Sequence, residues 1–229
     1  MQNETHNTTQ SKSDINRFAE EIREAVAQGG DIEKKIRELT LEAMHTHGLD
    51  MESLKKIATA VMEGAHEGSQ HALAHATEQS HAAQTQIVQA VAGLDTAFAQ
   101  LASASKLALE EAASKARQFS QGELTKTQAD LESLETLFLE TLSHAAKAAQ
   151  GLIAETLQDV HTHAVRNGTA VGAQLKDTLA VLAHQVASTG RAQVEAGLQL
   201  TQMTADMLHK ISSGVLTGIA DRIRQHDDK

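Results

Sequence analysis

Histidine is the chemically active residue type that stands out in this chain, which has thirteen copies of it. Several follow a glutamate in a Glu-x-x-His pattern, at Glu42/His45, Glu63/His66 and Glu78/His81. In carboxylate-bridged di-metal bundles, this pattern places both ligands on one face of a helix. Histidines four residues apart share a face in the same way. The candidate metal ligands are therefore those that combine both spacings, namely His71, His75, Glu78 and His81.

The spacing of these patterns argues against a metal centre. Glu63/His66 and Glu78/His81 fall on one expected helix, where 1.5 Å per residue separates them by about 22 Å. The matching pairs that a facing helix would supply are missing from the sequence. We therefore expect no metal site and no cofactor, and we interpret the histidines as solvated or interhelical polar residues.

A second interpretation of the histidines is a response to pH. No Lys or Arg occurs between Lys56 and Lys106, and this segment holds His66, His71, His75 and His81. Protonation near about pH 6 would add up to four positive charges there. The favoured alternative is a neutral polar helix face.

Motifs for nucleophilic or phosphate chemistry are missing. The chain has no Cys, no Gly-x-Ser-x-Gly elbow and no Gly-rich phosphate loop ending in Lys. We expect a protein that is not an enzyme, with no catalytic and no cofactor-binding residues.

Composition excludes several classes of partner. The net charge of −10 opposes binding to nucleic acid and to anionic lipid. Trp and Tyr are absent, so base-stacking platforms and membrane-interface anchors are missing. The polar start, residues 1–12, does not resemble a secretory signal, and no stretch of 18 apolar residues predicts a transmembrane segment. A cytoplasmic location is expected.

The same composition favours helices. Alanine dominates the apolar residues, and the chain has no Pro to break a helix. Residues 1–12 are expected to form a disordered tail, and residues 13–63 a head of short helices. The head divides at Gly29–Gly30 and Gly48, each followed by an aspartate suited to cap the next helix, Asp31 or Asp50.

Residues 64–225 are expected to form a bundle of long helices, followed by a solvated tail at 226–229. Apolar residues recur there with heptad spacing from Ile87 onward. Turns are expected near 120–122, where Ser120 and Glu123 fit a capping box, and near 167–168, at Asn167–Gly168. The apolar stripe comprises Ile87, Val91, Leu94, Phe98, Leu101, Leu131, Leu134, Phe138, Leu142, Leu175, Leu179, Leu182, Val186, Leu200, Ile211, Val215 and Ile219.

These elements predict an all-α protein. Short connections favour an elongated antiparallel bundle of long amphipathic, coiled-coil-like helices with the small helical head at its N-terminal end. A seam rich in alanine buries little apolar area per turn, so self-association is expected to contribute to stability. Gly214 and Gly218, spaced for close helix packing, fall in this region.

The alanine-rich heptads over residues 84–225 resemble bacterial phasins, helical proteins that coat granules and self-associate through coiled coils. A second resemblance is to an uncharacterised family of helical bacterial proteins, and it brings no established function. It rests on Leu94–Ala102, Arg117–Ser120 and Gly168–Gly172. Exchangeable apolipoproteins are similar in their amphipathic pattern, but their repeats are punctuated by Pro, which this chain lacks.

The sequence favours a non-enzymatic, phasin-like protein that self-associates and lays its apolar stripe on a hydrophobic granule or lipid surface. The alternative is a homo-oligomeric helical scaffold whose stripes are satisfied within the bundle and whose head binds a partner. A second alternative is a membrane-active pore former that opens its bundle. Burial or exposure of the apolar stripe discriminates between the first two.

Overall fold

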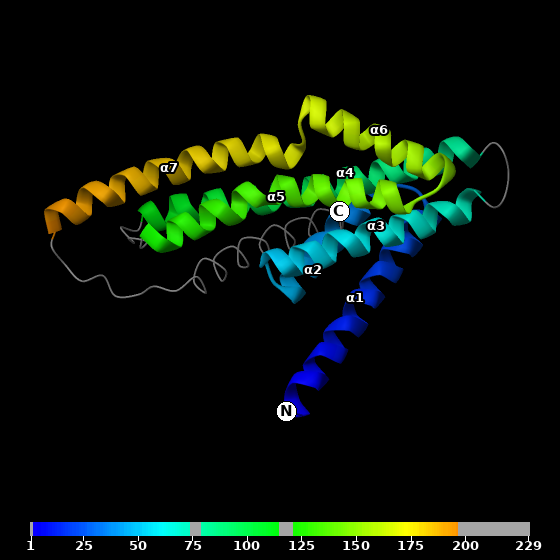
Figure 1. Ribbon diagram of the computed structural model, residues 1–229, viewed down its shortest axis with the longest axis horizontal. Coiled ribbons are helices and arrows are strands. Elements are labelled where there is room, and N and C mark those ends of the chain that lie inside the picture. Colours follow the sequence, from blue (N-terminus) through cyan, green and yellow to red (C-terminus); the bar gives the residue numbers. More distant parts are fainter. Residues whose placement is uncertain (1, 74–78, 115–120, 197–229) are drawn as a thin grey trace, which may run out of the picture. The chain divides into compact units, whose positions relative to one another are not determined.

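The computed structural model describes the backbone of residues 2–73, 79–114 and 121–196, and the side chains of 13–70, 81–111 and 125–184. Within these ranges every regular element is a helix, as the composition predicts. The helices are α1 (Gln2–Gln28), α2 (Ile32–His47), α3 (Met51–Leu73), α4 (Gln79–Ser114), α5 (Gln121–Ala148), α6 (Gly151–Asn167) and α7 (Ala170–Ala196) (Figure 1). The all-α class is thereby confirmed, and the elongated antiparallel arrangement stays a prediction.

The chain divides into two compact units. Unit 1 comprises Met1–Ala97 with Leu137–Gly168, and unit 2 comprises Phe98–Thr136 with Thr169–Lys229. Helices α4 and α5 each contribute one part to either unit. Helix α3 continues through residue 63, the expected end of the head, to Leu73. The expected division into a head at 13–63 and a bundle at 64–225 stays a prediction. The loss of Lys and Arg after Lys56 changes the surface charge of α3 without interrupting its backbone hydrogen bonds.

Helix α1 begins at Gln2, within the segment expected to be disordered and before the helix start expected near Ser13. No Gly or Pro occurs between Gln2 and Gln28 to stop a helix from extending. Phe18, Ile22 and Val26 of this helix are buried, and their four-residue spacing places them on one face.

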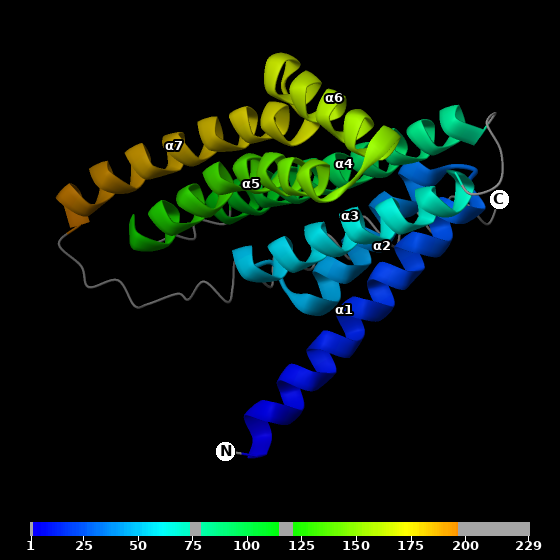
Figure 2. The same cartoon turned by 45° about the vertical axis from the view of Figure 1, so that its right-hand side comes forward.

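Helices α1 and α3 pack against each other (Figure 2). Gly64 and Gly68 of α3 lie at this contact. A Cβ built on Gly68 would lie 2.6 Å from the carbonyl oxygen of Arg23 and 2.9 Å from Cβ of Val26. A Cβ on Gly64 would collide with the carbonyl oxygen of Ala19 and lie 2.9 Å from Cβ of Ile22. These distances are shorter than van der Waals contact, so this seam requires a residue with no side chain at each position.

The ends of the short helices are capped as the sequence predicts. Asp31 accepts a hydrogen bond from the amide of Lys34 at the start of α2. The amide of Gly48, which has φ of 102°, donates to the carbonyl of Met44 at the end of that helix. Asp50 caps the start of α3. Its Oδ1 accepts hydrogen bonds from the amides of Glu52 (3.1 Å) and Ser53 (3.0 Å).

A break between α5 and α6 divides a segment that the apolar spacing predicts as one long helix from Leu124 to Val160. Helix α5 ends at Ala148 and α6 begins at Gly151, which has φ of +58°. The Gln150 side chain makes no capping hydrogen bond, so the only local mark of the break in the sequence is the glycine. Helix α6 ends at Asn167, at one expected turn, and α5 begins at Gln121, beside the other.

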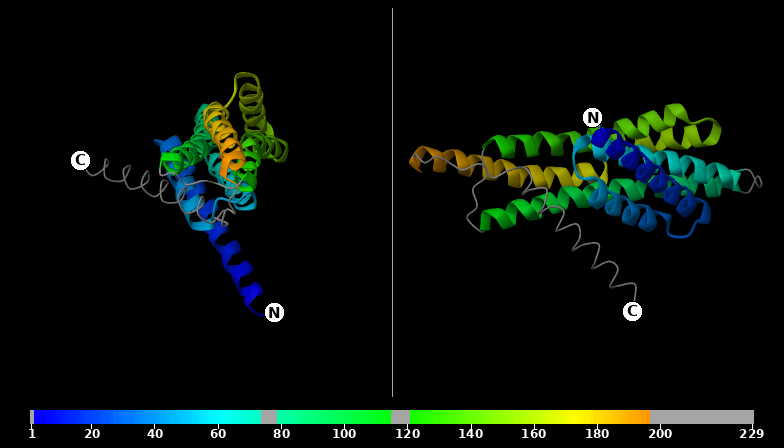
Figure 3. Two further views of the ribbon diagram at one scale, coloured as in Figure 1. Left: turned by 90° about the vertical axis from the view of Figure 1, so that its left-hand side faces the viewer. Right: turned by 90° about the horizontal axis from the view of Figure 1, so that it is seen from below.

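In unit 2, helix α7 runs beside α4 and α5 (Figure 3). Polar side chains connect it to both helices. Thr169 caps α7: its Oγ1 accepts from the amide of Gly172 and donates to Oε1 of Glu135, both at 2.8 Å. The hydroxyl of Thr178 lies 3.0 Å from the carbonyl oxygen of Ala102. These contacts satisfy buried hydroxyl groups across helix boundaries, so they define which face of α7 packs inward.

The described side chains of the apolar stripe are buried, with the exception of Leu179. Leu179 is half-buried, and Val186, Leu200, Ile211, Val215 and Ile219 lie outside the described side chains. The buried members are Ile87, Val91, Leu94, Phe98, Leu101, Leu131, Leu134, Phe138, Leu142, Leu175 and Leu182. Exposed large apolar side chains in the described ranges are Val88, Leu107 and Val165, which are 45%, 48% and 59% exposed and lie well apart along the chain. The free protein therefore presents single apolar residues here, and no continuous stripe.

Helix α4 contains one segment that is long and apolar enough, by length and composition alone, to cross a membrane, although it holds no run of 18 apolar residues. It covers His81–Glu111, with a mean hydropathy of 1.2. Alanine and scattered aliphatic residues give this average without any unbroken apolar run. Because 56% of its most apolar window is buried in the structure, the segment also meets the description of a core helix in a soluble protein.

Replacing Gly68 by Ala tests the close seam between α1 and α3. Alanine improves helix propensity by about 1 kcal/mol, but the new methyl group must push the two backbones apart. We expect the overpacking to dominate and to lower the free energy of unfolding by about 1–3 kcal/mol. Urea unfolding followed by circular dichroism measures this change.

Glu67→Ala is the matched control, because Glu67 is an exposed neighbour in the same helical turn. We expect this variant to stay within about 0.5 kcal/mol of the wild type. A Gly68→Ala protein as stable as the wild type would show that the seam tolerates a side chain.

Candidate functional site

Two grooves in unit 1 flank the exposed side of α3. The first, the α3/α5 groove, has a volume of about 190 Å³ and lies between α3 and the part of α5 from Leu137 to Ala148. The second, the α1/α3 groove, has a volume of about 330 Å³ and is lined from α1 by Ile15, Asn16 and Ala19. Lys55, Thr59 and Glu63 of α3 line both grooves.

Capping at Asp50 positions the start of the helix that separates the two grooves. Besides the two amides, the carboxylate accepts a hydrogen bond from Oγ of Ser53 at 2.7 Å. Burial acts to raise the pKa of Asp50, but the hydrogen bonds from Ser53, from its own amide and from Glu52 outweigh it. The pKa therefore lies below its ordinary value of 3.8.

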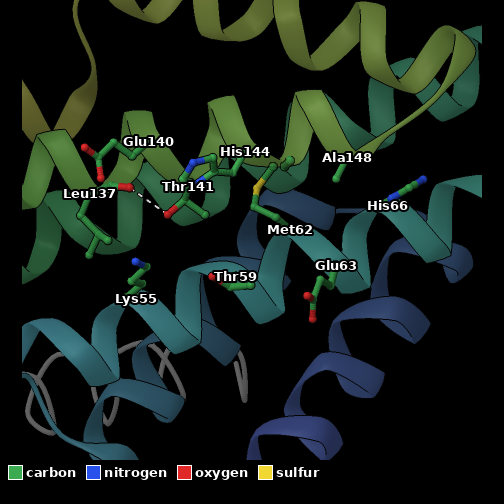
Figure 4. Close-up of a pocket in the computed structure, with 11 residues that line it drawn as sticks. Lys55, Thr59, Met62, Glu63, His66, Leu137, Glu140, Thr141, His144 and Ala148 are labelled. Atoms are coloured by element: carbon green, nitrogen blue, oxygen red, sulfur yellow. Dashed lines mark hydrogen bonds between the residues drawn. The ribbon is translucent and has the colours of Figure 1, made fainter.

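The α3/α5 groove has an apolar floor. Met62 and Leu137 are buried, and Figure 4 shows Met62 reaching from α3 toward Thr141 and His144 of α5. Thr141 donates its hydroxyl hydrogen to the carbonyl of Leu137 at 2.8 Å, so this group is satisfied within its own helix. The floor can therefore accept an apolar side chain without leaving a polar group unpaired.

The rim of the α3/α5 groove carries ionisable side chains. Lys55, Glu63, Glu140 and His144 are exposed, and His66 is half-buried and accepts a hydrogen bond from Nε2 of Gln70 at 2.8 Å. Within the described part of the chain, no ion pair includes Lys55, Glu63 or Glu140. Their charges face solvent and remain available to a partner.

Of the four metal-ligand candidates from the sequence, the structure describes the side chain of only one, His81. His81 is exposed on α4. The side chain of His71, and both the backbone and the side chain of His75 and Glu78, lie outside the described residues. Glu63 and His66 line the α3/α5 groove, whereas Glu42 and His45 lie exposed on α2. Across the described residues, no group of three or more His, Asp and Glu side chains is arranged to hold a metal ion.

The α5 side of this groove is not predicted by the Glu-x-x-His pattern. Glu140 and His144 share one face of α5 with a four-residue spacing, the same spacing that relates His71 to His75. A search for Glu-x-x-x-His would have found this pair. Only the packing of α5 beside α3 places Glu140 and His144 on the same groove as Glu63 and His66.

Chemically, this arrangement suits binding. An apolar floor between charged rims is the pattern by which helical proteins receive an amphipathic helix. Charges at the rim of such a groove select the partner and its orientation.

One protein family matches this chain over residues 8–225, and it is described as a family of unknown function (DUF6781). No curated protein and no solved structure matches the chain.

Removing the cap at Asp50 tests how α3 is positioned. Because the folded pKa is lowered, the stabilisation by Asp50 is present above pH 3.8 and is lost as the pH falls through the folded pKa. We expect Asp50→Ala to lower the free energy of unfolding by about 0.5–2 kcal/mol at pH 7. The difference from the wild type should shrink in acid, as urea unfolding at neutral and acid pH would measure.

Asp159→Ala is the matched control, because it removes an exposed carboxylate from the middle of α6 and makes the same change in charge. It should leave stability nearly unchanged at either pH. A deficit in Asp50→Ala that stays constant or grows in acid would contradict the role of the ionised carboxylate.

Proposed function

The chain belongs to this family of unknown function, and we propose that it is a non-enzymatic, homo-oligomeric helical scaffold of the cytoplasm. The observation that carries the proposal is the burial of the apolar stripe from Ile87 to Leu101, from Leu131 to Leu142 and at Leu175 and Leu182. A protein that coats a surface in its free form would expose this stripe. Here the stripe is used to pack helices within the chain.

Features of the surface support binding to protein partners. Its described large apolar residues are scattered, and single exposed residues of this kind are ordinary on soluble proteins. The grooves on either side of α3 supply the concave surface, with charged side chains beside an apolar floor. Self-association adds stability to a core in which many buried side chains are alanine.

A phasin-like coat is the second candidate, and α4 favours it. His81–Glu111 is apolar enough to lie in a hydrophobic phase, and its stripe would become available if the bundle opened on a granule or lipid surface. Opening would replace packing between helices by contact with the surface. That contact contributes about 25 cal/mol of favourable free energy per Å² of apolar area that it removes from water.

The same helix is the observation behind a third candidate, a membrane-active pore former. This function requires α4 to leave the core and cross the bilayer, and it predicts leakage from vesicles. Leakage separates it from a coat, which binds without permeabilising.

Sedimentation and flotation together test the proposed scaffold. We expect the weight-average mass to rise with concentration in sedimentation equilibrium, because the protein binds copies of itself. We expect it to remain at the bottom of a density gradient with phosphatidylcholine vesicles or oil droplets, because the stripe is buried.

A compact monomer at every concentration would contradict the homo-oligomeric scaffold. Flotation with droplets would favour the coat, and release of a dye trapped in the vesicles would favour the pore. A charged, non-amphipathic protein of similar size provides the baseline for non-specific flotation.

A further inference from the structure

A ridge of exposed side chains runs along α3 between the two grooves. It consists of Lys55, Thr59 and Glu63, spaced by four residues, and we call it the α3 ridge. All three line the groove on either side, so the ridge stands between the two grooves. Figure 4 shows these three side chains on α3, beside the α3/α5 groove. Rows of this spacing are the surfaces that fit into grooves when helices pack.

The charges of the α3 ridge have no partner within the described part of the chain. Neither Lys55 nor Glu63 takes part in an ion pair there. The neighbouring Lys56, by contrast, lies 2.7 Å from Glu52 on the same helix. Lys55 and Glu63 are eight residues apart and cannot reach each other along the helix, where side-chain pairs form at three or four residues.

The order of the residues makes the α3 ridge self-complementary. Lys55 and Glu63 carry opposite charges and lie on either side of Thr59, each about 6 Å away along the helix axis. A two-fold axis at Thr59 would place Lys55 of each copy opposite Glu63 of the other. This reciprocity is the requirement of a two-fold interface, in which a residue i contacts j and j contacts i.

We propose that the α3 ridge is the two-fold contact through which two copies of this chain associate. Each ridge lies antiparallel to the other and packs into the α3/α5 groove of the second copy. The apolar floor at Met62 and Leu137 contacts the stems of the incoming side chains.

A helix from an unrelated protein matches the charge order of the α3 ridge less well than a second copy does. An unrelated helix would need an independent arrangement of charges, whereas a second copy supplies the complementary order from the same sequence. The inference rests on the proposed self-association and names the surface that mediates it.

Charge reversal with reconstitution tests the interface. Lys55→Glu alone places a carboxylate opposite Glu63 at both ends of the contact, and Glu63→Lys alone places two ammonium groups opposite each other in the same way. We expect each variant to raise the dimer dissociation constant about tenfold, since two pairs are lost and repulsion is added. An equimolar mixture of the two variants should associate as tightly as the wild type, because every opposing pair is again of opposite charge.

The controls make the same charge changes elsewhere in unit 1. Lys147→Glu on α5 and Glu155→Lys on α6 alter exposed side chains that line neither groove. They should leave the dissociation constant within about twofold of the wild type, as expected for surface charges without a specific partner. Circular dichroism verifies that every variant folds.

The outcomes separate this inference from the proposed function. A wild type that stays monomeric at all concentrations overturns both. A wild type that associates, with Lys55→Glu behaving like Lys147→Glu, overturns the α3 ridge alone. A mixture of Lys55→Glu and Glu63→Lys that associates no more tightly than either variant alone also overturns the α3 ridge as the contact.

A cross-link gives an independent readout that does not depend on charge. The chain has no Cys, so Thr59→Cys introduces a single thiol at the proposed axis. Diamide should convert this variant to a disulfide-linked dimer, because the two thiols meet across the axis and are oxidised while diamide is reduced. Glu155→Cys, with an exposed thiol off the axis, is the control, and equal cross-linking of the two variants would contradict the proposal.

Discussion

The close contact between α1 and α3 at Gly64 and Gly68 is the constraint on which the described part of unit 1 depends. Carbonyl oxygens of Ala19 and Arg23 occupy the space that side chains would take. This contact fixes which face of α3 is inward, because Ile57, Val61 and Ala65 are buried with it. The opposite face is left to carry Lys55, Thr59 and Glu63, so the grooves and the α3 ridge follow from where the glycines lie.

Periodicity in the sequence predicts the buried faces of α4 and α5 but not the partners of those faces. The heptad from Ile87 to Leu101 is buried as expected, because spacing alone determines which residues share a side of a helix. The close seam at Gly64 and Gly68 cannot be predicted in this way, because it depends on α1 lying opposite them. The break at Gly151 escapes prediction because no Pro or strong cap accompanies it.

At the candidate site, too, the sequence indicates residues within one helix but not those that a second helix brings beside them. Glu63 and His66 stand out by their types and spacing, and both lie on the α3/α5 groove. Their interpretation as metal ligands depends on matching residues from facing helices, and the described residues contain no such cluster. Glu140 and His144, far away in sequence, lie on this groove through tertiary packing. A binding surface made from two helices cannot be assembled from the pattern of either one.

A scaffold buries the apolar stripe within the free protein, whereas a coat spreads the stripe on a hydrophobic surface. Amide hydrogen exchange distinguishes these two states of the stripe. Exchange is followed by mass spectrometry over peptides from α4 and α5, with and without oil droplets. We expect slow exchange over Ile87–Leu101 and Leu131–Leu142, unchanged by droplets, because these helices are held by buried side chains. Fast exchange in the free protein, or protection that develops only with droplets, would show instead that the stripe is reserved for a surface.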